Sequence, residues 1–279
     1  MRIALGLEYD GSGFNGWQSQ PDGRSVQDAL ERALQAVAGE PVRTIAAGRT
    51  DAGVHASMQV VHFDTPVERP QTAWVRGVNA YLPPTVAVLW AQGVDPGFHA
   101  RFAAIARHYS YYLLNRPVRA GLLARRVGWY HRALDVQAMR EAAAGLLGTH
   151  DFSAFRAAEC QARTPVKTLA KADITCDGDL IRFDFSADAF LHHMIRNLVG
   201  SLVHVGAGKA APAWFQDVLR GTDRTRAAAT FAADGLYFTG VDYPASFALE
   251  HTQARTVHLA CVSATDGRRT GAAVSVHPR

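Results

Sequence analysis

The feature that most limits what this chain can fold into is a pattern of strands and an amphipathic helix that occurs twice. Residues 25–39 open with Ser-Val-Gln and close on glycine, and residues 135–148 open with Asp-Val-Gln and close on glycine. Short runs of β-branched and aromatic residues lie on both sides of each helical segment. Two halves built alike predict an α+β fold, in which similar half-domains share one central, mostly antiparallel sheet flanked by helices.

Hydrophobic periodicity assigns the individual elements. A serine cap with Asp28 at its third position starts the first helix, and the turn Asp177-Gly178 joins two strands into a hairpin. Strands are expected at residues 3–9, 42–47, 58–63, 86–94, 109–114, 166–176, 180–186 and 235–241, and helices at residues 25–39, 72–81, 135–147 and 188–206. The two halves then comprise residues 1–104 and 105–250. Residues 251–279 lack any period and are expected to form a flexible basic tail.

Composition limits the class of protein. The 279 residues are 48% hydrophobic and 19% charged, which is typical of a soluble globular protein. No apolar run is long enough to span a bilayer, and the first eight residues alternate like a strand instead of forming a signal peptide. The three cysteines have neither metal-ligand nor disulfide spacing, so the cytoplasm is the expected compartment.

The segment Gly48–Ala56 contains the first candidate for catalysis. Two glycines bracket Asp51, with Arg49 two residues before it and His55 four residues after it. Extended runs flank the segment, so two strands would hold this carboxylate on a loop that a substrate can approach closely. A turn whose aspartate bonds only local amides is the alternative, and spacing alone does not exclude it.

Positive charge is concentrated in one stretch of the body. Residues 251–279 contain four arginines and one acidic residue, and the whole chain has a net charge of +4, so residues 1–250 are nearly neutral. Residues 96–134 nevertheless contain seven arginines, no acidic residue and several aromatic rings. Guanidinium groups for phosphates beside flat rings for bases favour RNA binding, whereas a solvated basic face over core aromatics is the alternative. The candidates for phosphate contacts are Arg101, Arg107, Arg116 and Arg126.

Gly11, Gly13 and Gly16 spell the G-x-G-x-x-G pattern of dinucleotide-binding proteins directly after a strand. That pattern requires a helix to begin inside the motif, so that the pyrophosphate can lie on its N-terminus. Here residues 17–23 continue as a loop, and the helix begins only at Ser25. We therefore expect no dinucleotide cofactor at this motif.

Arg196 lies within the apolar stripe of the helix expected at residues 188–206. An arginine in such a position either extends its guanidinium to water or meets a carboxylate. The position of Arg196 leaves both outcomes open. A bidentate guanidinium–carboxylate pair would keep such a carboxylate ionised and fix its orientation.

Several motifs, taken in order, resemble those of the tRNA pseudouridine synthase A family. They are Glu8-Tyr9-Asp10-Gly11 with Gly16-Trp17-Gln18, then residues 48–55, 98–102 and 192–197, and finally Gly235-Leu236-Tyr237. The resemblance extends over about residues 1–245 and leaves the predicted tail uncovered. It implies the pseudouridine synthase fold and a homodimer that isomerises uridine at tRNA positions 38, 39 and 40, without a metal or cofactor.

The same resemblance implies roles for individual residues. Asp51 matches the family's catalytic aspartate, and Arg49 matches its loop arginine. Tyr109 matches the tyrosine that lies against the target base, and Leu236 matches the apolar contact beneath the uracil. Arg196 matches the arginine that pairs with the catalytic carboxylate, so we expect a bidentate pair with Asp51, although the two residues are far apart in the sequence.

The chemistry is compatible with these residue types. Pseudouridine forms when the N1–C1′ bond breaks, the uracil turns, and C5 joins C1′. A carboxylate can assist by attacking C1′ or by stabilising positive charge there, as carboxylates do in glycosidases. A base must then remove the C5 proton, and Asp51 and Tyr109 are both candidates. The target base must also leave its stack, at a cost of roughly a few kcal/mol that aromatic residues offset in part.

Two other classes of protein remain open. A catalytically silent RNA-binding module would use Asp51 structurally, and it would bind tRNA without releasing tritium from 5-tritiated uridine. A metal-dependent hydrolase would lose its activity on chelation, and its ligands would come from His55, His62, His192 and His193. The hydrolase is disfavoured because His192 and His193, adjacent on a helix, would point to different faces.

Overall fold

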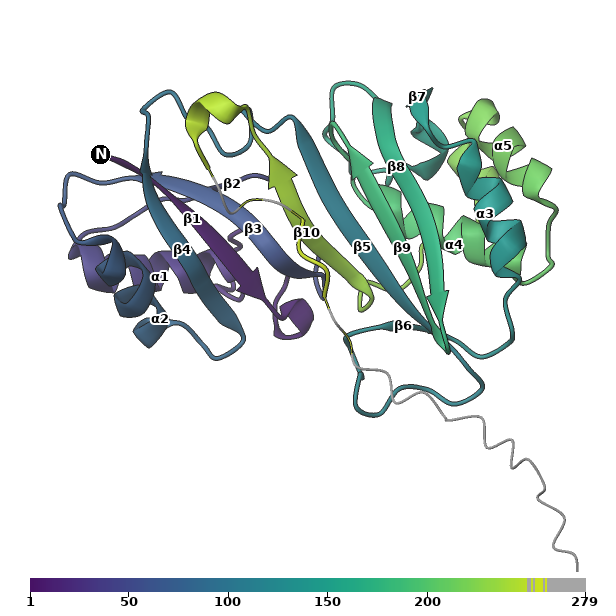
Figure 1. Ribbon diagram of the computed structural model, residues 1–279, viewed down its shortest axis with the longest axis horizontal. Coiled ribbons are helices and arrows are strands. Elements are labelled where there is room, and N and C mark those ends of the chain that lie inside the picture. The colour runs from purple at the N-terminus through teal and green to yellow at the C-terminus, as the bar shows by residue number, and fades with distance from the viewer. Residues whose placement is uncertain (250–251, 253, 258, 260–279) are drawn as a thin grey trace, which may run out of the picture.

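The computed structural model describes residues 1–249, 252, 254–257 and 259. They form an α+β fold in which helices flank one ten-stranded sheet, as expected (Figure 1). The strands are β1 (Arg2–Tyr9), β2 (Ile45–Ala46), β3 (His55–Asp64), β4 (Val86–Val94), β5 (Ala106–Asn115), β6 (Gly128–Tyr130), β7 (Gly148–Asp151), β8 (Val166–Asp177), β9 (Leu180–Ala187) and β10 (Leu236–Asp242). The α-helices are α1 (Val26–Ala38), α2 (Val78–Tyr81), α3 (Val136–Ala144), α4 (Met194–Gly206) and α5 (Pro212–Gly221). None of the helices in this described part is both long and apolar enough to cross a bilayer.

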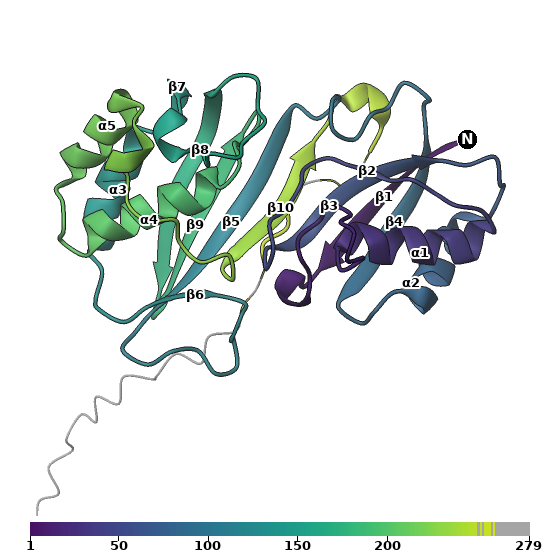
Figure 2. The same cartoon turned by 180° about the vertical axis from the view of Figure 1, so that it is seen from behind.

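The sheet has the strand order β4-β1-β3-β10-β5-β9-β8-β7, with β2 beside β3 and β6 beside β5. Its pairs are antiparallel except for β3–β10 and β5–β6, so the expectation of a mostly antiparallel sheet is confirmed. The strands of residues 1–104 and those of residues 105–250 meet where β10 lies between β3 and β5. Helices α1 and α4 lie on the same face of the sheet, toward the viewer in Figure 2.

Helix α1 shows why the sequence pattern predicts local structure well. Ser25 Oγ accepts a hydrogen bond from Asp28 N, and the Asp28 carboxylate accepts one from Ser25 N, which completes the expected capping box. Gly39 ends the helix in the left-handed region, with φ of +78°. The buried stripe includes Leu30 and Leu34, and burying each leucine contributes about 1.5–3 kcal/mol.

The glycines of the G-x-G-x-x-G pattern serve the loop that carries Asp51. Gly11 to Gly13 form a short 3₁₀ turn, and α1 begins only at Val26, as expected. A Cβ atom at Gly11 would lie 1.9 Å from the carbonyl oxygen of Val54. Gly16 has a φ of +87°, and a Cβ there would lie 2.6 Å from the carbonyl oxygen of Thr50. These glycines allow the segment after β1 to pack directly against the backbone of the loop.

Two predicted helices are shorter than the periodicity indicates. The helix expected at 188–206 begins only at Met194, because His193 has a left-handed φ of +60°. The carboxylate of Asp188 accepts hydrogen bonds from the Ala189 and Thr168 amides, which holds the preceding loop against β8. The helix expected at 135–147 ends at Ala144, and β7, which was not predicted, begins at Gly148. Strand β6 and helix α5 were also not predicted.

Part of the predicted tail packs on the body. Thr252 is buried, its carbonyl accepts from Val241 N, and Arg255 N donates to Thr239 O beside β10. Ser57 Oγ donates to Arg255 O, and Val257 N donates to the Tyr112 hydroxyl. A flexible tail that begins at residue 251 is therefore wrong for residues 252–257 as far as they are described. The rest of the tail lies outside the described residues.

Truncation after Leu249 should lower the melting temperature by several degrees. Each lost hydrogen bond contributes about 1 kcal/mol, and a chain of this size shifts by about 2–4 °C per kcal/mol. Truncation after Leu259 is the matched control, because it keeps every contact of Thr252, Arg255 and Val257. Thermal unfolding of both variants and of the full chain measures the difference. Equal melting temperatures for the two truncations would mean that these contacts contribute nothing.

Candidate active site

The candidate site lies where the two halves of the sheet meet. Because β3 and β10 are parallel, the loop before β3 and the start of β10 lie at the same end of the sheet. Strand β5 lies beside β10 and brings Tyr109 opposite Phe238. A cavity of about 980 Å³ opens there, and its lining includes Asp51, Arg49, Tyr109, Leu191 and Leu236.

The backbone around Asp51 is fixed from several sides. The carbonyl of Thr50 accepts from Trp17 N, and its hydroxyl hydrogen-bonds to the buried hydroxyl of Tyr9 at 2.9 Å. Val54 N donates to the carbonyl of Asp51 itself, across Gly53 with its φ of +79°. The Asp51 side chain remains 23% exposed at the cavity. A loop fixed in this way presents one carboxylate to a ligand.

Arg196 reaches Asp51, as the sequence analysis expected. Its Nη1 lies 3.2 Å from Asp51 Oδ2, and the Arg196 side chain is only 17% exposed. The expected bidentate geometry is wrong, because Arg196 Nε donates instead to the carbonyl of Phe231 at 2.9 Å. The guanidinium is thus held between the carboxylate and the segment before β10. This geometry supplies a fixed positive charge behind one oxygen of Asp51.

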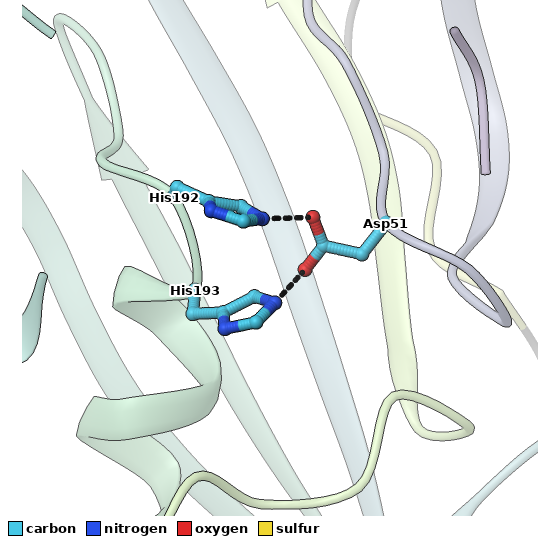
Figure 3. A group of neighbouring side chains, drawn as sticks. All are labelled: Asp51, His192 and His193. Carbon is cyan, nitrogen blue, oxygen red and sulfur yellow. Dashed lines mark ion pairs between the residues drawn. The ribbon is translucent and has the colours of Figure 1, made fainter. Parts of the chain in front are cut away.

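Two histidines complete the surroundings of the carboxylate (Figure 3). His192 Nε2 lies 3.3 Å from Asp51 Oδ1, and His193 Nε2 lies 3.3 Å from Oδ2. The expectation that these histidines point to different helix faces is wrong, because both precede α4 and the left-handed backbone at His193 turns both rings toward the loop. From the sequence, His192 and His193 were considered only as metal ligands and were not placed beside Asp51. The signal that could have found them is their position within one turn of Arg196.

The carboxylate and the two imidazoles lie within 4.8 Å of one another, a spacing that could hold a metal ion. Of the histidines considered for a hydrolase, however, His55 and His62 are elsewhere. His55 Nδ1 accepts from Gly11 N, and His62 Nδ1 accepts from Ala100 N. The guanidinium of Arg196 also opposes a second cation at the same oxygen. The arrangement therefore favours an Asp51 carboxylate that is held by protein groups over one that binds a metal ion.

His193→Leu should lower kcat by about ten- to a hundredfold, the value of one hydrogen bond to a charged group. Burial lowers the pKa of His193, although Asp51 opposes the shift, so the ring is neutral at pH 7, and its Nε2 lies 3.3 Å from Asp51 Oδ2. We expect this nitrogen to carry the proton and to donate to that oxygen. His193→Gln is the conservative control, because its amide can still donate. Single-turnover rates of both variants measure the effect. Equal rates for the two variants would contradict a donor role for His193.

Tyr109 and Leu236 belong to the apolar part of the cavity. Tyr109 meets the rings of Phe190 and Phe238 edge to face, with centroids 5.1 and 4.8 Å apart. Burial raises the pKa of Tyr109 far above its usual value, so the side chain remains a neutral phenol. Leu236 is 5% exposed and lines the same cavity. Apolar walls beside a carboxylate suit a flat, uncharged ring.

The candidate arginines occupy different surroundings. Arg49 and Arg101 are exposed and line the cavity. Arg126 Nη2 lies 3.2 Å from Asp10, and Arg116 Nε donates to the carbonyl of Val118. Arg107 is different, since its guanidinium donates to the carbonyls of Ala47, Arg101, Ala104 and Asp188. Its donors are used inside the protein, so the structure favours a bracing role over a phosphate contact.

Comparison with known proteins shows the family to which this chain belongs. The family model described as tRNA pseudouridine synthase matches residues 7–103 and 142–244, and the chain belongs to that family. A tRNA pseudouridine synthase A of Chromobacterium violaceum is 65% identical over 250 residues, which cover 89% of this chain and 95% of that one. The protein of the same name from Thiobacillus denitrificans is 63% identical, over 91% of this chain and 98% of its own. The family predicted from the motifs is confirmed.

A third relative with that name, from Paraburkholderia phymatum, is 59% identical over 92% of this chain and 96% of its own length. Among solved structures, a Cbf5-Nop10-Gar1 complex is similar over 85% of this chain and 48% of that one. The TM-score there is 0.33 and the identity 11%.

Proposed function

We propose that this chain isomerises uridine to pseudouridine in the anticodon stem-loop of tRNA, at positions 38, 39 and 40. The observation that carries the proposal is a partly exposed carboxylate, Asp51, held by Arg196 and two histidines at an apolar cavity. The names of the relatives support tRNA as the substrate. The cavity volume is at the upper end of the roughly 300–1,000 Å³ typical of ligand sites, which leaves room for a nucleotide turned out of its stack.

The geometry supports a division of labour between the two oxygens of Asp51. Oδ2 is held by Arg196 and His193, so we assign Oδ1 to the attack on C1′ or to charge stabilisation there. His192, whose side chain is 38% exposed, contacts Oδ1 from the open side and has room to move when substrate enters. Leu236 and Tyr109 then hold the detached uracil while it turns and C5 joins C1′.

The C5 proton must leave before the product is complete, and N1 must gain one, so the isomerisation conserves every atom. Tyr109 is poorly suited to remove the C5 proton, because burial keeps it a phenol. Asp51 faces the cavity and is a carboxylate once C1′ has been released. Of the two bases considered from the sequence, the structure thus supports Asp51.

Tritium release from tRNA that carries 5-tritiated uridine tests the proposal directly. We expect release by the pure protein, with pseudouridine mapped to positions 38, 39 and 40, and no change on treatment with a chelator. Binding without release would favour a silent RNA-binding module. Activity lost on chelation and restored by a metal would favour the hydrolase.

Arg116→Ala and Arg126→Ala should each weaken tRNA binding and reduce the slope of log K against log salt by about one unit. Arg107→Ala should instead lower the melting temperature, because its guanidinium is bonded to four carbonyl oxygens. Arg220 on α5 is exposed and serves as the control, since we expect no change in slope on its replacement. Binding titrations at several salt concentrations separate these outcomes. Unaltered slopes for both Arg116 and Arg126 would place the RNA elsewhere.

The homodimer implied by the resemblance and the cytoplasmic location expected from the cysteines also remain part of the proposal. Val118 and Leu122 are 69% and 91% exposed on the segment between β5 and β6, and such apolar exposure is compatible with a partner subunit. Sedimentation of the pure protein at several concentrations would measure the oligomeric state. A monomer at all concentrations would remove the dimer from the proposal.

A further inference from the structure

Phe102 has an exposure that its chemistry does not explain. All thirteen phenylalanines lie in the described part of the chain, and Phe102 is the one that is exposed, at 75%. An aromatic ring left in water forgoes a large hydrophobic stabilisation, so a single exposed ring beside a cavity suggests a ligand. Phe102 lines the cavity that Asp51 faces, together with His99 and Arg101.

The ring of Phe102 is held in place from beneath. It stacks on the His99 ring, with centroids 4.3 Å apart and planes 28° apart. The amides of Arg101 and Phe102 both donate to His99 Nδ1 at 3.2 Å, which fixes the turn that carries the ring. His99 in turn packs against the buried ring of His62, at 4.9 Å between centroids. A ring held in place in this way can bind a ligand at little entropic cost.

Positive charge accompanies the exposed ring. The Arg101 guanidinium lies over the Phe102 ring, 5.6 Å from its centre, and Arg101 is itself exposed to solvent. Burial and the neighbouring arginines lower the pKa of His99, so the stacked imidazole is neutral at pH 7. A flat ring beside one cation matches a nucleobase with its adjoining phosphate, since bases stack on aromatic side chains and arginine contacts the backbone.

The turn that carries Arg101 and Phe102 is also fixed relative to the candidate active site. Arg107 donates to the carbonyl of Arg101 and to that of Ala47, which precedes the Asp51 loop. The same guanidinium donates to Asp188, in the segment that leads to His192 and His193. The distance from Phe102 to the reacting carboxylate is therefore set by internal hydrogen bonds.

We propose that Phe102, backed by His99 and flanked by Arg101, is a stacking subsite for a second nucleobase of the substrate RNA, beside the target uridine. The inference rests on the proposed function and extends it to a base that does not react. Phe102 holds a neighbouring nucleotide out of its stack while the target uracil lies against Tyr109 and Leu236. Phe102 is then a substrate-binding residue that contributes to the choice of tRNA position.

Phe102→Ala should weaken binding of the anticodon stem-loop RNA on the order of tenfold or more, and the loss should appear mainly in KM. Phe102→Trp should bind at least as tightly as the wild type, because a larger ring stacks as well, whereas Phe102→Leu should resemble Phe102→Ala. Tyr81→Ala is the matched control, since Tyr81 is 63% exposed at the end of α2 and does not line the cavity. Melting temperatures check that each variant folds.

A set of stem-loop RNAs, each with one abasic nucleotide near the target, identifies the partner base. At one position the abasic change should weaken binding to the wild type, and it should add nothing to the loss caused by Phe102→Ala. Binding by Phe102→Ala or Phe102→Leu within twofold of the wild type would overturn the subsite. Additive losses at every position would also overturn it. Pseudouridine formation by the wild type is measured in parallel, so a failure of the proposed function is recognised separately from a failure of the subsite.

Discussion

Asp51→Asn should lose pseudouridine formation by a factor on the order of 10⁴ or more, the size of effect expected when a nucleophilic group is removed. An amide has nearly the same shape as the carboxylate, but it carries no charge for C1′ and cannot take a proton from C5. The variant should still fold, because Arg196 keeps its hydrogen bond to Phe231 and the loop keeps its backbone contacts. Its affinity for tRNA should be close to that of the wild type.

Single-turnover tritium release measures this loss without interference from product release. Asp173→Asn is the control, since its carboxylate is 64% exposed on β8 and does not line the cavity. Turnover by Asp51→Asn within tenfold of the wild type would show that Asp51 is not the catalytic group. A large loss of tRNA affinity in the same variant would instead indicate that the carboxylate acts in binding.

Replacement of Arg196 should have the second largest effect. Arg196→Lys should fold but lose most activity, because one ammonium group cannot reach Asp51 and the Phe231 carbonyl with the guanidinium's geometry. Arg196→Met should lose more. Removing one partner of a fully buried ion pair costs about 3–5 kcal/mol, and the effect here should be smaller because Asp51 is 23% exposed and also contacts His193.

A double-mutant cycle isolates the contact itself. Asp51→Asn combined with Arg196→Met should be destabilised less than the sum of the two single variants, since neither side chain is then left with an unpaired charge. Denaturant unfolding of the four proteins gives the coupling energy. Strict additivity would mean that the 3.2 Å contact contributes nothing to stability.

The sequence predicts the parts of the site whose signal is local. The glycines beside Asp51 and the capping box of α1 can be read within a few residues, and both are present in the structure. The contact between Asp51 and Arg196 spans much of the chain, yet it follows from one rule, that an arginine among apolar residues needs an anion. The family then suggested which anion.

Two features of the site could not be predicted from the sequence. One depends on the backbone conformation of a single residue, and the other on whether hydrogen-bond donors of an arginine are already used inside the protein. The apolar stripe continues through Phe190 and Leu191, so periodicity extends the helix backward, and only the left-handed φ of His193 stops it. That single residue decides where both histidines point. The sequence shows only that Arg107 is a positive charge in a basic stretch. In the fold its guanidinium donates hydrogen bonds to carbonyl groups that lie far apart in the sequence.

The position of β10 makes the order of synthesis matter. This strand is the last of the sheet to leave the ribosome, and its place is between two strands made long before it, β3 and β5. Until residues 236–242 arrive, the parts of β3 and β5 that pair with β10 lack that partner, and Leu236 is absent from the cavity that Asp51 faces. A nascent chain therefore holds its carboxylate, its arginine and both histidines without a finished pocket around them. The last strand of the sheet thus also supplies a wall of the cavity.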